Sequence, residues 1–265
     1  MASSEHTRPS QGGHGATSQA APGNSVLKVQ GLCKSYGEIV VSDEVSFTLA
    51  KGHCLGVIGP NGAGKSSLFN LLTGVAQPER GSIRLAGREL VGLPVHQRAR
   101  MGIARAFQIP QPFTHLSVYE NVLAAASFGA GLHSNRAGEA AMTALERTGL
   151  LRHSTTLAGA LSLLDRKRLE LAKGIASAPQ VLLLDEVAGG LTEREVHSIV
   201  DLVQELKKDV AVIWIEHIAH ALKAVADRVM VLHFGKKLLE DTPSIVMDSA
   251  IVREIYMGMP ADATA

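Results

Sequence analysis

Hydrophobic and polar residues follow one another along the chain in patterns that predict strands and helices. Residues 26–29 and 45–49 alternate apolar and polar side chains, as a strand with one buried face does. Residues 54–58 form a continuous apolar run, as in a strand buried on both faces, and residues 66–72 have helical spacing. Residues 81–87 have the composition of a short hairpin. The first third of the chain is therefore predicted to be rich in strands.

The rest of the chain is predicted to be helical at first and then to alternate between helices and strands. Apolar spacing and many alanines predict helices from residue 118 to 158, which would form a separate lobe. A helix is then expected at 162–175, a buried strand at 181–184, a helix at 193–206 and a second buried strand at 211–215. Apolar strands that alternate with helices are typical of a parallel sheet covered on both faces. No internal repeat is found, which indicates one module rather than a tandem pair.

The two ends of the chain differ in composition from the middle. Residues 1–25 are rich in Ser, Gly, Ala, Gln and Thr and lack the apolar core of a signal peptide. We therefore expect a disordered N-terminal tail at 1–25, one folded domain at 26–258 and a short C-terminal tail at 259–265.

Charge and cysteine content narrow the classes of function. The chain has 26 Lys and Arg residues against 25 Asp and Glu residues, so no strong positive field would attract nucleic acid. Its longest uncharged stretches, such as residues 121–135, are too short or too polar to span a membrane as a helix. The two cysteines, Cys33 and Cys54, lie in apolar, strand-like segments, which predicts buried free thiols in a reducing compartment.

Residues 59–66 have the pattern Gly-x-x-x-x-Gly-Lys-Ser between an apolar strand and a helix, which predicts a phosphate-binding loop. Its glycines allow backbone N–H groups to turn toward phosphate oxygens, and the start of the helix adds a partial positive charge. Lys65 would then contact the β- and γ-phosphates, and Ser66 would bind Mg²⁺. The alternative is a glycine turn with a solvated lysine. The residues expected to contact the nucleotide are Gly59, Pro60, Asn61, Gly62, Ala63, Gly64, Lys65, Ser66 and Ser67.

Two acidic residues, Asp185 and Glu186, follow the apolar run 181–184. Ligands of open α/β sheets bind at the carboxyl ends of the strands, so both acids are expected beside the phosphate loop. Asp185 would hold Mg²⁺ through its water shell, and Glu186 would act as general base toward the attacking water. The alternative is two solvated acids at the start of the next helix. Together these patterns predict an α/β fold, with a P-loop NTPase core built on a parallel sheet, an antiparallel β subdomain and a helical lobe at about residues 114–175.

Further landmarks at Tyr36, Gln108, residues 161–165 and His217 occur in the order of one family, and residues 26–258 resemble the nucleotide-binding subunit of an ABC transporter. The resemblance implies that Tyr36 stacks on adenine and that His217 contacts the γ-phosphate. It also implies that Gln108 contacts Mg²⁺ and water and links the ATP site to the helical lobe. Simpler roles stay open for each: an ordinary tyrosine, an exposed loop glutamine and a histidine that caps the next helix.

The family's Leu-Ser-Gly-Gly-Gln signature loop aligns here with a segment that keeps only Leu161 and Ser162. In an ABC dimer this loop closes over the ATP of the opposite subunit, so the resemblance implies that Ser162 contacts the partner's nucleotide in trans. The side chain of Leu164 is expected to crowd the approach of the backbone to phosphate. Asp165 adds a carboxylate near another anion, although a carboxylate in the first turn suits the helix dipole.

Residues 105–113 and 116–122 look like segments of the ATPases of branched-chain amino-acid importers, and residues 256–258 resemble the end of those proteins. This resemblance implies an ATPase that uses ATP and Mg²⁺ and forms a homo- or heterodimer with a second ABC ATPase subunit. It would be cytoplasmic and peripheral on the inner face of the cell membrane, beneath separate transmembrane permease subunits, with a solute-binding protein as an indirect partner. Importers of amides, urea or short peptides have similar ATPases, so the resemblance does not assign the solute.

Three functions are weighed on these residues. The leading hypothesis is an ATP-hydrolysing subunit that energises import of a small polar solute, such as branched-chain or related amino acids. The altered signature loop, with Val187 in place of the usual Pro and Thr192 at the position of an acid, raises the alternative of an ATP-binding regulatory subunit with weak hydrolysis in a heteromeric complex. Glu186 and His217 argue against that alternative. A soluble ABC-type ATPase that acts on DNA or ribosomes is disfavoured by the single module and the near-neutral charge.

Overall fold

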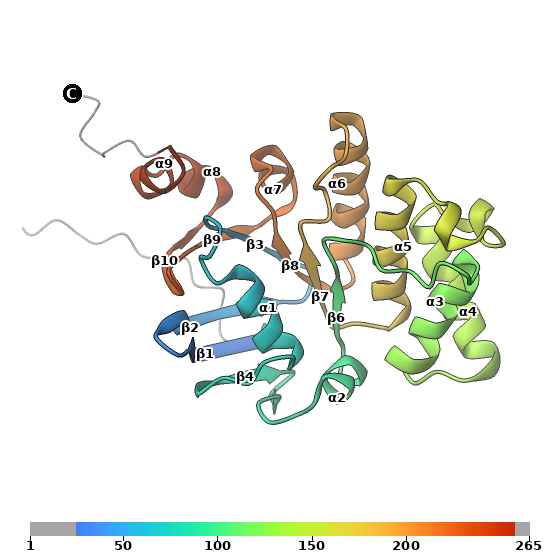
Figure 1. Ribbon diagram of the computed structural model, residues 1–265, viewed down its shortest axis with the longest axis horizontal. Helices are drawn as coiled ribbons and strands as arrows, with labels where there is room; N and C mark the ends of the chain where they lie inside the picture. The colour runs from blue at the N-terminus through green and yellow to red at the C-terminus, as the bar shows by residue number, and fades with distance from the viewer. Residues whose placement is uncertain (1–24, 258–265) are drawn as a thin grey trace, which may run out of the picture.

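Two β-sheets and the helices around them make up residues 25–257, the part of the chain that the computed structural model describes (Figure 1). One sheet has four strands in the order β2-β1-β4-β5, and the other has six in the order β10-β9-β3-β8-β7-β6. The strands are β1 (Ser25–Tyr36), β2 (Ile39–Ala50), β3 (Cys54–Ile58), β4 (Arg80–Leu85), β5 (Arg88–Glu89), β6 (Ile103–Ala106), β7 (Val181–Asp185), β8 (Ala211–Ile215), β9 (Arg228–His233) and β10 (Lys236–Asp241). The tails predicted at 1–25 and 259–265 lie outside the described residues, apart from Ser25, which begins β1.

The helices occupy the segments between the strands of the larger sheet and the stretch between β6 and β7. They are α1 (Lys65–Thr73), α2 (Val95–Arg100), α3 (Val118–Ala124), a π-helical turn (Ala125–Gly129), α4 (Ser134–Arg147), two 3₁₀ turns (Leu151–His153 and Ala158–Ala160), α5 (Leu163–Ala176), α6 (Glu193–Lys207), α7 (Ala219–Val225), α8 (Pro243–Met247) and α9 (Ala250–Met257). Among residues 25–257, no helix is both long enough and apolar enough to cross a membrane.

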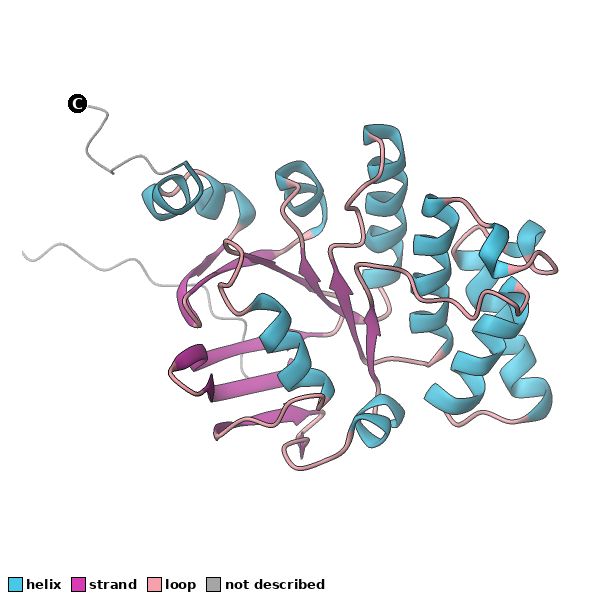
Figure 2. Cartoon of the chain, viewed as in Figure 1, coloured by secondary structure: helices cyan, strands magenta, loops and turns pink. Residues whose placement is uncertain are grey.

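The six-stranded sheet is buried on both faces because its strands carry apolar residues in succession. β3, β6, β7, β8 and β9 run parallel, and only β10 pairs antiparallel. Along β8, Ile213 and Ile215 enter one hydrophobic cluster with Phe69 of α1, whereas Val212 and Trp214 enter a second cluster with helices α6 and α7. Figure 2 shows the resulting layers, with α1 and the four-stranded sheet on one side and α5, α6 and α7 on the other. The predicted α/β fold with a parallel sheet is confirmed.

The smaller sheet is antiparallel, as the alternating pattern predicts. β1 pairs with β2 and with β4, and β4 pairs with β5 in the hairpin expected near residues 81–87. Leu27 and Val29 point into the cluster that contains α1, while Lys28 between them is exposed. Cys33 and Cys54 are buried free thiols, also as predicted.

The helical segment between β6 and β7 has a core of its own. Val118 and Val122 of α3, Ala141 of α4 and Leu169 of α5 belong to a third hydrophobic cluster, separate from those of the sheet. Ser117 begins α3 with a capping box, because its hydroxyl accepts from the backbone N–H of Glu120 while the Glu120 carboxylate accepts from the backbone of Ser117. These helices occupy the segment where the sequence predicts a helical lobe.

Sequence patterns missed several elements, among them β9, β10 and the short α2 and β6. β6 has only four residues, and two of them are alanines, so it shows neither a long apolar run nor clear alternation. It is nevertheless the edge strand that pairs with β7 and delivers the segment that begins at Phe107 to the site.

Candidate active site

The loop between β3 and α1 approaches neighbouring backbone so closely that glycine is required at two positions. Gly64 has a φ of 101°, and a Cβ atom there would lie 2.3 Å from the carbonyl oxygen of Val41. At Gly59 a Cβ atom would lie 2.2 Å from the carbonyl oxygen of Leu232. The loop is therefore held between the backbones of β2 and β9, with α1 beginning directly after Gly64.

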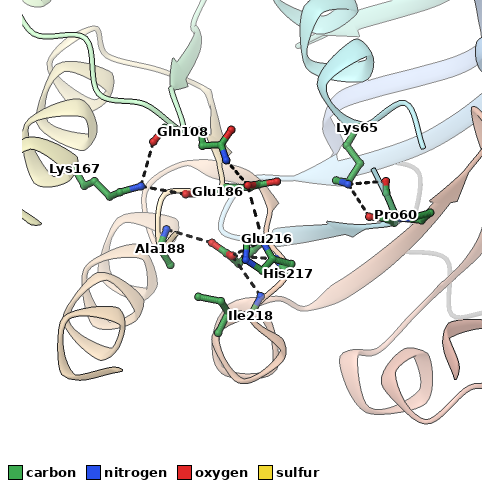
Figure 3. A network of polar contacts seen from close by, with 10 residues as sticks. Pro60, Lys65, Gln108, Lys167, Glu186, Ala188, Glu216, His217 and Ile218 are labelled. Atoms are coloured by element: carbon green, nitrogen blue, oxygen red, sulfur yellow. Dashed lines mark hydrogen bonds and ion pairs between the residues drawn. The ribbon is translucent and has the colours of Figure 1, made fainter. Parts of the chain in front are cut away.

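Lys65 is half-buried in this loop, and its ammonium is held by the loop itself. Nζ donates to the carbonyl oxygens of Gly59 at 2.6 Å and Pro60 at 3.0 Å (Figure 3). Burial lowers the pKa of Lys65 below its ordinary value, and the charges of Glu186 and Asp185 oppose that shift. The loop thus places a cation beside two carboxylates and at the positive end of a helix, where an anion is favoured.

The two acids after β7 lie in different surroundings. Asp185 is buried and pairs through Oδ2 with Nη2 of Arg105 at 2.5 Å, and Arg105 also donates to Oδ1 of Asn70 at 2.9 Å. Glu186 has a φ of 45°, an unusual backbone conformation for a residue with a side chain, and its carboxylate faces a cavity. The sequence predicts adjacent acids with different tasks, but nothing in the linear pattern indicates that Arg105 reaches Asp185.

Three residues with predicted catalytic roles meet at one carboxylate oxygen. Gln108 donates from Nε2 to Oε2 of Glu186 at 2.6 Å, and Nδ1 of His217 lies 4.0 Å from the same oxygen (Figure 3). Nδ1 of His217 also lies 3.6 Å from Oε1 of Glu216. α7 begins only at Ala219, so His217 stands before the helix with an exposed ring that is available to a ligand.

A cavity of about 830 Å³ joins the phosphate loop to these residues. Two apolar side chains of β2, Ile39 and Val41, also line it, and sequence patterns did not single them out. Ile39 is 69% exposed, and an exposed apolar side chain beside a phosphate loop is the signal that could have identified it. The described lining residues are Ile39, Val41, Gly59, Pro60, Asn61, Gly62, Ala63, Gly64, Lys65, Ser66, Ser67, Gln108, Glu186 and His217.

Three predicted site residues lie outside this lining, within the described part of the chain. Tyr36 ends β1 with 52% of its surface exposed, and the ammonium of Lys34 lies 5.1 Å from the centre of its ring. Asp185 is buried and forms an ion pair with Arg105. Ser162 caps α5. The role of Tyr36 toward adenine therefore stays a prediction.

The loop at Ser162 differs from expectation in the placement of its leucines. Leu164 is half-buried and packs against the second core cluster, whereas Leu163 is the exposed one. The helix turns the Leu164 side chain toward the protein interior, so the predicted crowding of a partner's phosphate by Leu164 has no support in this placement. Oγ of Ser162 donates to Oδ2 of Asp165 at 2.9 Å and accepts from the backbone N–H of Asp165 at 3.2 Å. Arg168 lies 3.5 Å from the Asp165 carboxylate.

Two buried charged residues behind the site were missed by the sequence analysis. Glu216 accepts backbone N–H groups from His217 at 3.0 Å and Ala188 at 3.2 Å, and burial raises its pKa above the ordinary value. Lys167 donates to the backbone carbonyls of Gln108 at 3.2 Å and Glu186 at 3.3 Å. Glu216 directly precedes His217, but its bond to Ala188 and the position of Lys167 are tertiary contacts, which spacing along the sequence does not indicate.

The donors present fit a magnesium ion that is bound together with phosphate. No group of three or more His, Cys, Asp and Glu side chains within residues 25–257 could hold a metal alone. The Ser66 hydroxyl, the Gln108 amide and the Asp185 carboxylate are oxygen donors around the phosphate loop, and Mg²⁺ prefers oxygen ligands that include phosphates and water. Arg105 occupies one oxygen of Asp185, and the carboxylate has a second.

Comparison with known proteins extends the similarity far beyond these motifs. A family model described as ABC transporter matches residues 42–189. The high-affinity branched-chain amino acid transport ATP-binding protein LivG of Salmonella typhimurium is 36% identical over 249 residues, which cover 88% of this chain and 98% of LivG. The lipopolysaccharide export system ATP-binding protein LptB of Acidithiobacillus ferridurans is 34% identical and covers 89% of this chain and 98% of its own. The ADP conformation of MJ1267, an ATP-binding cassette of an ABC transporter, has a TM-score of 0.81 at 27% identity, over 89% of this chain and 99% of that one.

Proposed function

Because this chain belongs to the ABC transporter ATP-binding family, we propose that it hydrolyses ATP to ADP and phosphate to energise solute import through a separate membrane permease. Branched-chain or related amino acids are the solute class that we assign, since LivG, which serves that transport, aligns along almost the whole of both chains. The resemblance of residues 105–113 and 116–122 to importer ATPases favours this class over the export role of LptB.

The convergence of Gln108, Glu186 and His217 beside the phosphate loop is the observation that carries the ATPase assignment. In this proposal the loop amides and Lys65 bind the phosphate chain, and Glu186 accepts the proton of a water that attacks the γ-phosphorus. The bond to the β-phosphate oxygen breaks, ADP and phosphate form, and the proton stays on Glu186 until product release. Gln108 orients the Glu186 carboxylate, and His217 contacts the γ-phosphate as charge is redistributed.

Mg²⁺ would be held by Ser66, Gln108 and Asp185, and when bound it would neutralise charge on the phosphate oxygens. The ion pair with Arg105 fixes the direction of the Asp185 carboxylate.

A second ABC ATPase subunit and transmembrane permease subunits are the partners that we propose, with a solute-binding protein in indirect contact. Ser162 would meet the ATP of the second subunit in trans. A groove of about 260 Å³ between the sheet and the helical segment supports a permease contact, because exposed Val75, Val95 and Phe107 line it. Phe107 directly precedes Gln108, so a permease segment in this groove would lie next to the catalytic carboxylate's hydrogen-bond partner. We propose that these contacts hold the protein at the cytoplasmic face of the membrane.

Glu186→Gln tests the chemistry. The amide nearly matches the carboxylate in shape but cannot accept a proton, so the hydrolysis rate should fall by about 10² to 10⁴ while ATP affinity is kept. The rate is measured in single turnover with the full chain at high protein concentration, and affinity by equilibrium titration with ATP. Glu193→Gln, an exposed acid at the start of α6, is the matched control. Hydrolysis by Glu186→Gln at the parental rate would show that another group is the base.

Uptake measurements test the solute class. Cells that lack the gene should lose uptake of labelled leucine, isoleucine or valine, and the parental gene should restore it while Glu186→Gln should not. Loss of urea or short-peptide uptake, with leucine uptake intact, would assign the related importer class instead.

The regulatory alternative is favoured by one observation, the replacement of the signature glycines by Leu163 and Leu164. It predicts ATP binding without faster turnover when partner subunits are added. The proposed function predicts that turnover rises with protein concentration or on addition of the partner ATPase.

A further inference from the structure

Lys167 is a buried cation directly behind the catalytic carboxylate. It projects from α5, and only 3% of its surface is exposed. Nζ donates to the backbone carbonyl oxygens of Gln108 at 3.2 Å and Glu186 at 3.3 Å (Figure 3). Burial of an ammonium is costly in free energy unless its N–H groups find acceptors. These two carbonyl oxygens are the acceptors that offset this cost.

The same two residues are joined a second time through their side chains. Nε2 of Gln108 donates to Oε2 of Glu186 at 2.6 Å. Lys167, Gln108 and Glu186 therefore form a closed ring, in which one cation holds the two backbones and the two side chains hold each other. The ring joins three segments that are distant in sequence: α5, the segment after β6 and the residue after β7.

The backbone of Glu186 needs such support. Its φ of 45° lies in the left-handed region, where a residue with a side chain is strained and persists only if its surroundings fix it. Its N–H donates to the carbonyl of Ile215 at 2.8 Å. Its carbonyl accepts from the backbone N–H of Gly189 at 3.1 Å, within the same turn, and from the ammonium of Lys167 at 3.3 Å. Removal of Lys167 would leave the two backbone contacts but would take away the cation that joins the Glu186 carbonyl to that of Gln108, which would allow the carboxylate to turn.

We propose that Lys167 is a positioning residue for hydrolysis, which holds Gln108 and Glu186 in the arrangement that presents the Glu186 carboxylate to the cavity. Lys167 lies outside the cavity lining and acts only through these two residues. This inference rests on the proposed role of Glu186 as general base.

The test compares Lys167→Met with Lys173→Met in the full chain. Methionine keeps much of the length and apolar stem of lysine but donates no hydrogen bond. Lys173 is a matched control because it lies on the same helix and donates to the carbonyl of Gln111 at 3.3 Å, beyond the catalytic pair. Single-turnover hydrolysis at saturating ATP should fall by about 10- to 100-fold in Lys167→Met, the size expected for lost hydrogen bonds to a charged group. ATP affinity should stay unchanged, and Lys173→Met should keep the parental rate.

Three further measurements separate positioning from general loss of structure. Hydrogen exchange of residues 186–190 should be faster in Lys167→Met and unchanged in Lys173→Met. Lys167→Arg, which keeps the charge and its donors, should recover most of the rate. Addition of Lys167→Met to Glu186→Gln should lower the rate no further, because both changes act on the same step. If Lys167→Met does not fold, Lys167→Gln takes its place, with the same split between rate and affinity expected.

Parental turnover in Lys167→Met would overturn the inference, as would an equal loss of rate and ATP affinity or an additive effect with Glu186→Gln. These outcomes differ from failure of the proposed function, which would appear as parental turnover in Glu186→Gln or as no turnover in the unmodified chain.

Discussion

The first turns of α1 and α5 are both expected to face phosphate, and they differ in how their backbone N–H groups are used. α1 begins after Gly64, and no side chain of the described residues caps it. α5 begins after Ser162, whose hydroxyl accepts the N–H of Asp165 and donates to the Asp165 carboxylate. The first backbone N–H groups of α1 are therefore available to an anion, whereas in α5 the N–H of Asp165 is already bound by the Ser162 side chain.

This difference shows that one chain can carry two unequal halves of a shared site. The half around Lys65 has a glycine loop, a cation and three catalytic side chains that meet at one oxygen. The half around Ser162 already places a carboxylate where a phosphate oxygen would compete for the same hydroxyl. In a dimer with a partner that has an intact signature loop, we expect the site built on Lys65 to be the faster one.

Gly64→Ala should have the largest effect on this comparison, because it distorts the loop that leads into the uncapped start of α1. A side chain at φ 101° is strained, and its Cβ atom would lie 2.3 Å from the Val41 carbonyl oxygen. Stability should fall by at least about 2 kcal/mol, and ATP binding should be lost. Gly62→Ala is the control, since Gly62 also has a positive φ of 81° but no atom lies within 4 Å of its Cβ position. Thermal unfolding and ATP titration measure both variants. Equal losses of stability and of ATP affinity in the two would show that backbone strain, and not the close approach to Val41, accounts for the effect of Gly64→Ala.

Asp165→Gln should have an intermediate effect, confined to the partner's ATP. It removes the carboxylate that engages Ser162, so turnover at the site closed by Ser162 should rise by about fivefold, the size of a favourable helix-terminus charge effect. Addition of Leu164→Gly should raise this turnover by less than the signature pattern suggests, because the Leu164 side chain packs toward the protein interior. Heteromeric complexes with one general-base variant at a time report each site separately. Equal rates at both sites, unmoved by Asp165→Gln, would mean that Arg168 already neutralises the carboxylate.

Ser162→Ala should have the smallest effect. In the isolated chain it should lower only the stability of the fold. Loss of an N-cap serine typically costs about 1 kcal/mol, which denaturant unfolding resolves. Binding of ATP to the chain's own loop should not change, because Ser162 lies outside that cavity. Weaker ATP binding by isolated Ser162→Ala would contradict the separation of the two halves.

The features that could be predicted from the sequence are those formed by residues close together in the chain. The phosphate loop and the acids after β7 were predictable because each consists of consecutive residues whose spacing with the flanking strand is itself the signal. Ser162 was predictable as a helix start for the same reason. Its bond to Asp165 is local as well, but residue types alone do not show which acceptor the hydroxyl prefers.

Long-range contacts account for what the sequence did not predict. Lys167 stands between two arginines in the sequence, and only the packing of α5 against the segments after β6 and β7 buries it. Arg105 reaches Asp185 because β6 pairs with β7, and four residues gave too weak a pattern to predict that strand. The buried carboxylate of Glu216 accepts the backbone N–H of Ala188, which lies in another loop.

The closeness of the phosphate loop to β9 also sets the order in which the protein can mature during synthesis. β3, which leads into the loop, pairs with β8 and β9, and Arg228 of β9 donates to the Thr48 carbonyl 180 residues earlier in the chain. The loop segment leaves the ribosome long before these strands do, so ATP can stabilise it only after β8 and β9 have also been made. A nascent chain that ends before β8 should therefore depend on chaperones rather than on nucleotide to keep its apolar β3 from aggregating.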